Sequence, residues 1–182
     1  FLHPNDILVL LYYYLVKFKG WHGAVVRNIA TTHMLDKVAA RFGETCYEVP
    51  VGFKYISAKM TETGAIIGGE SSGGLTVHGH INGKDGVYAA ALLVEMIAVT
   101  GKKLSEIMQD IHDECGEIHM EERDYKFTIE KKQAMQKTLM EDKLLPDLPF
   151  EIDHISYLDG TGVTDISSTT KTTVLSYLLY LQ

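Results

Sequence analysis

A glycine-rich segment in the middle of the chain, Gly68–Leu75, constrains the fold and the chemistry more than any other stretch. It follows the strand-like run Ala65–Ile67 and presents the Glu70 carboxylate beside the Ser71 and Ser72 hydroxyls. Glycines allow the backbone to approach a ligand closely and to adopt positive φ without steric cost. A carboxylate beside hydroxyls suits sugar hydroxyls, because each charge-assisted hydrogen bond contributes about 1.5–3 kcal/mol and is directional. The segment therefore predicts a loop that binds hydroxyl groups.

Strand-like and helix-like patterns alternate up to about residue 115, which predicts a mixed sheet between helices, a three-layer α/β/α fold. The expected strands are Ala24–Asn28, Thr45–Val49 and Ala65–Ile67. The expected helices are Asn5–Lys17, Thr32–Phe42, Gly52–Met60, Asp85–Val99 and Lys103–Cys115. Ligands in such sheets bind beyond the carboxyl ends of the strands, where Gly52 and Glu70 would both lie.

The helix predicted over Asp85–Val99 is almost entirely apolar beyond its first turn. Asp85 is well placed to cap its amino end. The sequence predicts that one face of this helix packs in the core. That face consists of Val87, Ala90, Ala91, Val94 and Ile97.

The charge balance limits the possible partners of the chain. The 182 residues carry a formal net charge of −7 and no basic block, which argues against nucleic acid as a partner. An anionic ligand would need local cations, for which Arg27, Lys54 and Lys84 are the candidates. Lys84 precedes a helix, where a cation is unfavourable unless an anion lies nearby. Arg27, at a strand end, could bind phosphate or pair with a carboxylate.

Compartment signals are sparse. Cys46 and Cys115 lack the spacing of a disulfide framework or a metal site, which fits free thiols in a reducing cytoplasm. The apolar run Leu8–Val16 is too short to span a bilayer and is flanked by polar residues, so no membrane association is expected.

Several segments together resemble one enzyme family. They are the loop Gly68–Leu75, the run Glu48–Ile56 around Val-Gly-Phe-Lys, the stretches Val25–Thr32 and Leu35–Ala39, the helical residues Gly101–Ile107, and Phe1–Leu8, which looks like the end of a preceding domain. In this order and spacing the chain resembles the third domain of the α-D-phosphohexomutases, the phosphoglucomutase/phosphomannomutase family. The family's sugar-binding loop usually reads Gly-Glu-(Glu or Met)-Ser-Gly, so Ser71 stands where Glu or Met is usual.

The resemblance implies a substrate and a set of contacts. The intact enzyme would move phosphate between the 1- and 6-positions of a hexose phosphate through a glucose 1,6-bisphosphate-type intermediate. Glu70 and Ser72 match the family's sugar-binding glutamate and serine. The substrate-binding set expected here is Gly52, Lys54, Gly69, Glu70, Ser72, Gly73 and Lys84, with Arg27.

The family's phosphoserine loop, its magnesium loop and its final phosphate-binding loop have no counterpart in this sequence. The resemblance therefore implies that Mg²⁺ and the nucleophile come from domains I and II, and further phosphate contacts from domain IV. The chain is expected to be a non-catalytic part of an enzyme. We expect residues 1–20 to end the preceding domain, residues 21–125 to form domain III, and residues 126–182 to form a linker helix and an α+β start of domain IV. After Gly160 the sequence departs from the family pattern.

Other interpretations remain open at this point. The chain could be a stand-alone phosphosugar-binding module without catalysis. Gly69–Gly73 also fits the G-x-S-x-G nucleophile elbow, with Ser71 as nucleophile and Asp153 and His154 as partners, although no helix pattern follows directly. His78 and His80 lie two residues apart and could bind a metal, but no third ligand at fixed spacing is evident.

Overall fold

The computed structural model describes residues 1–118, 126–144, 147, 154–158, 163–170 and 173–180, and for the last three ranges it describes the backbone. The chain divides into two compact units, Phe1–Met120 and Glu121–Gln182, each of which is described by itself below.

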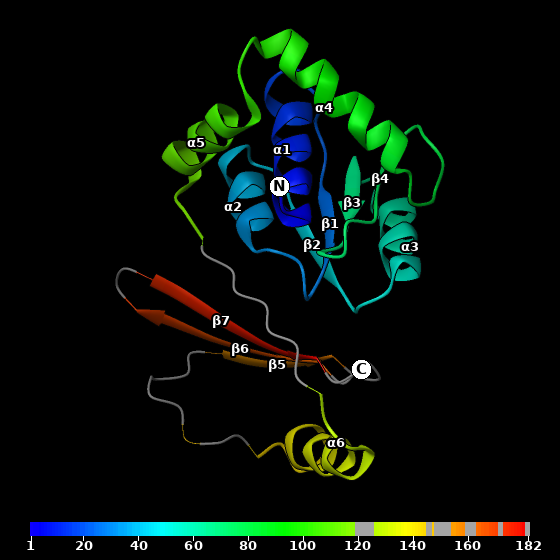
Figure 1. Cartoon of the computed structure of the whole chain (residues 1–182), viewed down its shortest axis with the longest axis vertical. Helices are drawn as coiled ribbons and strands as arrows, with labels where there is room; N and C mark the ends of the chain where they lie inside the picture. The colour runs from blue at the N-terminus through cyan, green and yellow to red at the C-terminus, as the bar shows by residue number, and fades with distance from the viewer. Residues whose placement is uncertain (119–125, 145–146, 148–153, 159–162, 171–172, 181–182) are drawn as a thin grey trace. The chain divides into compact units, whose positions relative to one another are not determined.

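A four-stranded mixed sheet organises the first unit. Its strands are β1 (Val25–Asn28), β2 (Cys46–Val49), β3 (Ile67–Gly69) and β4 (Leu75–Val77), in the order β2-β1-β3-β4. β1 pairs in parallel with β2 and β3, while β4 returns antiparallel to β3. The three parallel strands therefore have their carboxyl ends at one edge of the sheet (Figure 1). The sequence predicts β1, β2 and the start of β3 but not β4, because β4 is only three residues long and lies between the loop and the next turn.

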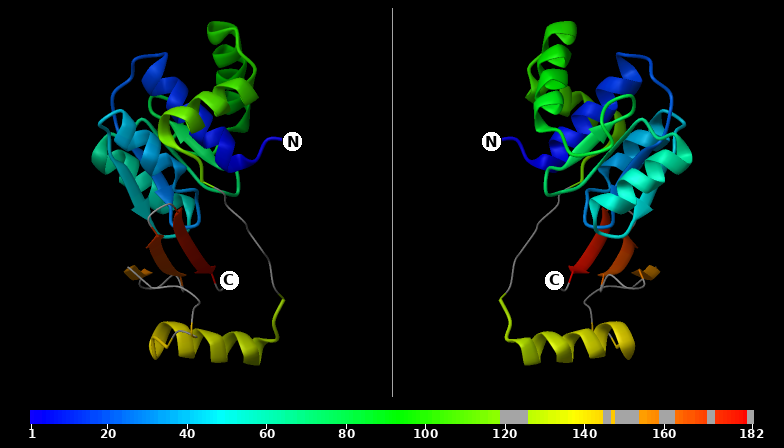
Figure 2. Two further views of the ribbon diagram at one scale, coloured as in Figure 1. Left: turned by 90° about the vertical axis from the view of Figure 1, so that its left-hand side faces the viewer. Right: turned by 90° about the vertical axis from the view of Figure 1, so that its right-hand side faces the viewer.

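Helices cover both faces of this sheet (Figure 2). One face carries α3 (Phe53–Thr63), which packs on β1, β2 and β3 over a small core of Val26, Val49, Ile56, Met60 and Ala65. The other face carries α1 (Pro4–Lys17) and α2 (Met34–Arg41) over the larger core. Two more helices, α4 (Gly86–Thr100) and α5 (Leu104–Cys115), pack against α1. The predicted α/β/α fold is confirmed.

The helix α1 lies inside the first unit. Every residue from Leu8 to Val16 is buried, and α1 contacts α2, α4, α5 and β3. The sequence assigns residues 1–20 to a preceding domain, whereas here the helix shares one core with β1 and β3, because it is apolar on all sides and is enclosed on all sides. In the sequence, Asn5 or Asp6 is a possible cap for this helix, whereas the structure caps it with His3. The His3 side chain accepts the Asn5 N–H, and Pro4 occupies the first turn.

Three consecutive tyrosines on α1 fan out to three different neighbours. The hydroxyl of Tyr12 donates to the carbonyl of Gly23 at 3.2 Å, that of Tyr13 to Glu114 at 3.0 Å, and that of Tyr14 to Glu95 at 2.7 Å. Burial, and then the hydrogen bond to Glu95, raise the pKa of Tyr14 to about 12. Each buried phenol thus has a polar partner, as a buried hydroxyl requires.

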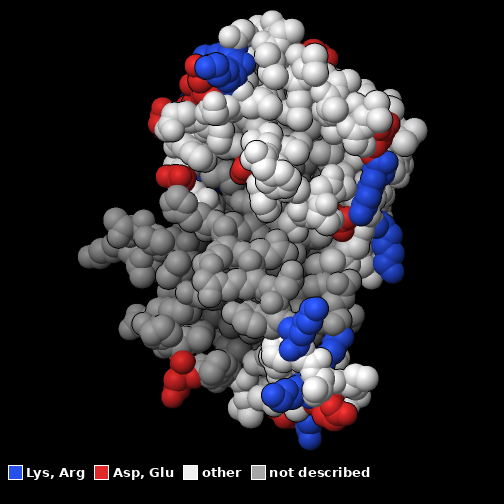
Figure 3. Space-filling view, in the orientation of Figure 1, with Lys and Arg blue, Asp and Glu red and all other residues white. Residues whose placement is uncertain are grey.

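The predicted core face of α4 is wrong. Val87 is 83% exposed and Val94 67%, and Ala90, Ala91 and Ile97 are also exposed. The buried face consists instead of Ala89, Leu92 and Met96. Because α4 is apolar on nearly every side, its sequence contains two apolar stripes, and only packing against α1 and β4 selects one. The surface around α4 is largely uncharged (Figure 3).

A matched pair of truncations tests which face of α4 is buried. Leu92→Ala is expected to lower the free energy of unfolding by about 2–5 kcal/mol, because it leaves a cavity in the core. Val94→Ala is expected to change it by less than about 0.5 kcal/mol, as is usual for an exposed site. Urea denaturation followed by circular dichroism measures both. A larger loss for Val94→Ala than for Leu92→Ala would restore the orientation that the sequence predicts.

The second unit is α+β in content. The helix α6 (Ile129–Gln136) begins at Thr128, whose hydroxyl accepts the Lys131 N–H, and continues into a π-helical turn, η1 (Lys137–Glu141). Strands β5 (His154–Leu158), β6 (Val163–Thr170) and β7 (Thr173–Tyr180) form an antiparallel sheet. Most of the tail that departs from the family pattern therefore lies in two strands. In the sequence, Pro146 and Pro149 predict a break after the helix and Asp159–Gly160 predicts a turn, but these four residues lie outside those that the structure describes.

Within the described part of the chain, the helices are all too short or too polar to traverse a lipid bilayer. The apolar run Leu8–Val16 is accounted for by burial in α1.

Candidate functional site

The carboxyl ends of β1, β2 and β3 bring three segments together at one edge of the sheet. β1 ends at Asn28, β2 leads through Pro50 to Gly52, and β3 leads into Glu70. Because these strands are parallel neighbours, residues more than 40 positions apart in sequence meet there. Open α/β sheets bind ligands at such an edge.

Glu70 places a buried carboxylate at this edge of the sheet. Its residue is 6% exposed, yet its carboxylate has a donor on each oxygen. The Asn28 side-chain amide donates to Oε1 at 3.2 Å, and the Lys84 ammonium lies 2.8 Å from Oε2. A carboxylate oxygen can accept more than one hydrogen bond, so each oxygen retains acceptor capacity for a ligand hydroxyl.

Glycines shape the loop that carries Glu70. The loop closes through hydrogen bonds from the Gly73 N–H to the Glu70 carbonyl and from the Glu70 N–H to the Gly74 carbonyl, both at 2.9 Å. Gly73 has a φ of 98°, which disfavours any residue with a Cβ. A Cβ at Gly69 would lie 2.8 Å from Leu8 Cδ2, so the start of the loop packs directly on α1. Ser72 lies exposed on this loop.

Two of the predicted cations, Lys84 and Lys54, have different partners. The Lys84 side chain is 52% exposed, pairs with Glu70 and has its ammonium 5.2 Å from the centre of the Phe53 ring. Gly52, with a φ of 132°, is the residue directly before α3. Lys54 is exposed, and its ammonium lies 4.8 Å from the Tyr55 ring centre. Lys84 therefore contacts the Glu70 carboxylate directly, whereas Lys54 lies on the first turn of α3 beside Tyr55.

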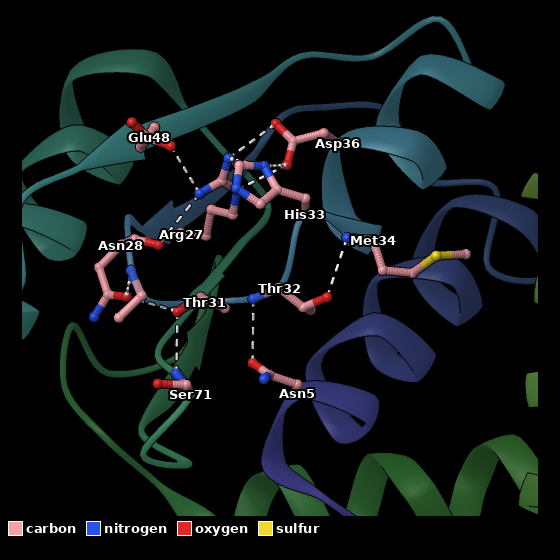
Figure 4. Close-up of polar contacts among 11 residues, drawn as sticks. Asn5, Arg27, Asn28, Thr31, Thr32, His33, Met34, Asp36, Glu48 and Ser71 are labelled. Atoms are coloured by element: carbon pink, nitrogen blue, oxygen red, sulfur yellow. Dashed lines mark hydrogen bonds and ion pairs between the residues drawn. The ribbon is translucent and has the colours of Figure 1, made fainter. Parts of the chain in front are cut away.

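Arg27 does not join this group. Its side chain is buried and lies between α2 and β2 (Figure 4). Its guanidinium donates to Asp36 at 2.8 and 3.3 Å and lies 2.9 Å from both Glu48 Oε2 and His33 Nδ1. Of the two roles that the sequence allows, the geometry therefore favours pairing with carboxylates over binding a phosphate, because the donors already have partners.

Cys46 lies close to this ion-pair cluster, and its thiol is expected to be unreactive. Burial raises the pKa of Cys46 to about 12, and the charge of Asp36 adds to the effect. Because the thiolate is the reactive form, iodoacetamide at pH 8 should modify Cys46 at least about 100-fold more slowly in the folded protein than in urea. Peptide mass spectrometry over time measures this ratio. Equal rates in the two states would contradict the burial of this thiol.

The structure does not provide the nucleophile elbow. After Ser71 and Ser72 the chain turns into β4, an antiparallel strand, whereas an elbow leads into a helix. The Ser71 N–H donates to the Thr31 hydroxyl at 3.0 Å, so its backbone serves the loop. Asp153 and the side chain of His154 lie outside what the structure describes.

The two histidines of the next turn differ in environment. His80 Nε2 lies 2.7 Å from Asp85 Oδ2, and the ring stacks on Tyr88 with centroids 4.1 Å apart. Asp85 caps α4 by accepting the N–H groups of Val87 and Tyr88, as the sequence predicts. His78 is exposed. Among the described residues, no cluster of three histidine, cysteine or acidic side chains could hold a metal ion.

Two residues of the site are missed by the sequence prediction. Asn28 and Thr31 are buried beneath the loop, and each makes a hydrogen bond to it. A polar residue at the end of an apolar strand is the available signal for Asn28. Only the pairing of β1 with β3 shows that the two residues lie under Glu70.

These features define a class of protein: a three-layer α/β/α domain that carries a buried carboxylate on a glycine-rich loop at the edge of its sheet. Residues 3–115 match the family described as phosphoglucomutase/phosphomannomutase, alpha/beta/alpha domain III, and the chain belongs to this family.

Comparison with individual proteins agrees. A phosphoglucosamine mutase of Carboxydothermus hydrogenoformans is 37% identical over 109 residues, which cover 59% of this chain and 24% of that protein. Phosphoglucomutase 1 of Drosophila melanogaster is 29% identical over 129 residues, 69% of this chain and 23% of that protein. A crystal structure from Thermus thermophilus, assigned as a phosphomannomutase, matches with a TM-score of 0.72 and 26% identity, covering 100% of this chain and 38% of that one. The chain thus spans about a quarter of the length of these curated relatives.

Proposed function

We propose that this chain is part of a phosphohexomutase and that its loop Gly68–Gly74 binds the hexose of a sugar phosphate during 1,6-phosphoryl transfer. The observation that carries the proposal is the buried carboxylate of Glu70, which is held between Asn28 and Lys84 at the ligand-binding edge of the sheet. The relatives named above, which are mutases of hexose phosphates by name, support the same chemistry.

The loop suits a substrate that must bind in two orientations. In a 1,6-transfer the sugar turns end over end between two phosphoryl transfers, which exchanges the places of adjacent hydroxyls. Glu70 accepts hydrogen bonds from either hydroxyl, and Ser72 lies exposed on the same loop to donate or accept. Near-equal binding of both orientations contributes affinity and positioning rather than chemistry.

Lys84 would supply positive charge to the anionic ligand within a negatively charged protein. Its half-exposed ammonium is paired with Glu70, and a phosphate oxygen nearby could share or take over this donor. Lys54 lies on the adjacent first turn of α3 and would add to the local potential.

The chemical steps belong to other parts of the proposed enzyme. The family's phosphoserine and magnesium loops are not in this sequence, and the described residues offer no metal cluster, so Mg²⁺ would be held elsewhere and the bisphosphate intermediate formed elsewhere. We include in the proposal that residues 126–182 begin the following domain and that the protein is cytoplasmic, which fits its two free cysteines. The family match makes the stand-alone module and the serine hydrolase less favoured.

Glu70→Gln tests the proposed role of the loop. Replacing the carboxylate by an amide keeps its shape but removes the charge from its hydrogen bonds, so affinity for glucose 1-phosphate is expected to fall about 10- to 100-fold. Amide shifts of isotope-labelled chain, titrated with glucose 1-phosphate, glucose 1,6-bisphosphate and inorganic phosphate, measure the affinity. The matched control is Glu62→Gln, which removes an exposed carboxylate paired with Lys59 and is expected to leave binding unchanged.

The three ligands separate the possible outcomes. Shifts at Gly68–Gly74 with both sugar phosphates but not with phosphate alone would support the sugar-binding loop. Equal shifts with phosphate alone would reduce the site to an anion site at Lys84. An unchanged affinity in Glu70→Gln would remove Glu70 from the site.

A further inference from the structure

A short chain of buried hydrogen bonds runs beneath the Glu70 loop. Asn28 and Thr31, the two residues that the sequence prediction misses, are 2% and 1% exposed. The Ser71 N–H donates to the Thr31 hydroxyl at 3.0 Å, and this hydroxyl donates to Asn28 Oδ1 at 2.7 Å (Figure 4). These hydrogen bonds therefore connect the loop backbone at Ser71 to the side-chain amide of Asn28.

The direction of these hydrogen bonds fixes the Asn28 amide. Its Oδ1 accepts twice, from the Thr31 hydroxyl and from the Ala30 N–H at 3.0 Å. The amide nitrogen must then lie on the other side, where it donates to Glu70 Oε1 at 3.2 Å. An exchange of the amide oxygen and nitrogen would break three contacts at once, so Asn28 can present only a donor to Glu70.

We propose that Asn28 and Thr31 are positioning residues that orient the Glu70 carboxylate for a ligand hydroxyl. This inference rests on the proposed function of the loop. Both groups that contact the carboxylate, the Asn28 amide and the Lys84 ammonium, are donors, so Glu70 is held as an acceptor. The ligand group that it takes must itself donate a hydrogen bond, as a sugar hydroxyl does and a fully ionised phosphate oxygen does not.

A neighbouring threonine provides a matched control. Thr32 is also buried, but its hydroxyl accepts the Met34 N–H at the start of α2 instead of serving the loop (Figure 4). Thr31→Val and Thr32→Val each remove one buried hydroxyl, so both should lower stability. Only Thr31→Val should remove the hydrogen bond that holds the loop at Ser71. Thr31→Ser keeps the hydroxyl and should therefore retain this hydrogen bond.

The first measurement needs no ligand. Amide hydrogen exchange of Ser71 in the full chain is expected to be about tenfold faster in Thr31→Val, because the acceptor of its N–H is lost. In Thr32→Val and Thr31→Ser it should match the wild type. Unchanged exchange of Ser71 in a folded Thr31→Val would overturn the proposal.

The second measurement uses glucose 1-phosphate as the probe. Thr31→Val is expected to weaken its binding about fivefold to tenfold, with rescue by Thr31→Ser and no loss in Thr32→Val. Asn28→Asp keeps the shape but sets a second acceptor against Glu70, so its loss should exceed about tenfold. If Thr31→Val fails to fold, Asn28→Asp decides, and wild-type affinity in that variant overturns the proposal.

The two measurements separate this inference from the proposed function. If the wild-type chain shows no binding of glucose 1-phosphate, the proposed function of the isolated chain fails, and Ser71 exchange still decides whether Thr31 holds the loop. If binding is present but the Thr31 and Thr32 variants weaken it equally, the positioning role fails while the sugar-binding role stands.

Discussion

A chain that lacks residues 1–20 is expected not to fold its first unit. The missing segment would remove α1, in which all residues of Leu8–Val16 are buried against β3, α2, α4 and α5. Burying one large apolar side chain stabilises a protein by about 1.5–3 kcal/mol, whereas whole domains are stable by only about 5–15 kcal/mol. The loss of one complete helix from the core therefore exceeds the stability that a unit of this size can have.

Heteronuclear NMR spectra and thermal melts of residues 21–182 measure this outcome. We expect poorly dispersed resonances for residues 21–118 and no cooperative transition from the α/β/α unit. A peptide of residues 1–20, added in trans, should restore dispersion, because it supplies the missing core. The matched control removes the other end: a chain of residues 1–120 should keep its cooperative melt, since it contains the whole first unit. A dispersed spectrum for residues 21–182 alone would show that α1 belongs to a different folding unit.

Arg27→Met is expected to lower the free energy of unfolding by about 3 kcal/mol. The substitution keeps the apolar volume of the side chain but leaves Asp36 and Glu48 facing each other without their shared cation. Removing one partner from a buried ion pair costs about 3–5 kcal/mol, and the lower end applies because the two carboxylates are 40% and 31% exposed and remain partly hydrated. Urea denaturation at pH 7 measures the change.

Two comparisons make the Arg27 prediction specific. Lys59→Met removes an exposed pair with Glu62 and should cost less than about 1 kcal/mol. Lowering the pH should reduce the free energy of unfolding more in the wild type than in Arg27→Met. Burial alone would raise the pKa of the Asp36 carboxyl, but hydrogen bonds from His33 and Arg27 hold it below its usual 3.8. A lowered pKa adds stability above the unfolded-state value, and this stability is lost as the pH falls through the folded-state value. Equal acid sensitivity in both proteins would contradict the pairing.

The sequence predicts the order of the elements well because their patterns are local. β1 and β2 and the five helices up to Cys115 lie within a few residues of their expected bounds, since glycine, proline and capping residues mark their ends. The loop with Glu70 is also predicted from local sequence, because a cluster of glycines beside a carboxylate is typical of a loop and not of a helix or strand interior.

The differences between the sequence predictions and the structure have a common cause: they depend on contacts between segments far apart in the chain. α1 and α4 are apolar on several sides, so periodicity cannot say which face of α4 is buried or which unit contains α1. Arg27 is a candidate for phosphate in the sequence because its partners Asp36 and Glu48 meet it only after α2 and β2 pack beside β1. Asn28 lies 42 residues from Glu70, and only the sheet brings them together.

The three tyrosines of α1 affect the rotation and register with which this helix packs in the core. A helix that is apolar on all sides has no polar face that fixes its rotation about its axis. Its apolar side chains alone could pack in the core in several orientations. Successive residues of an α-helix point about 100° apart, so Tyr12, Tyr13 and Tyr14 reach Gly23, Glu114 and Glu95 in three directions. A slip of one residue would give two phenols each other's partners, but it would leave the third hydroxyl and one of the three acceptors without a hydrogen bond. Apolar contacts therefore hold α1 in the core, and the three phenol hydrogen bonds, all of which form only in the observed register, favour that register over its neighbours.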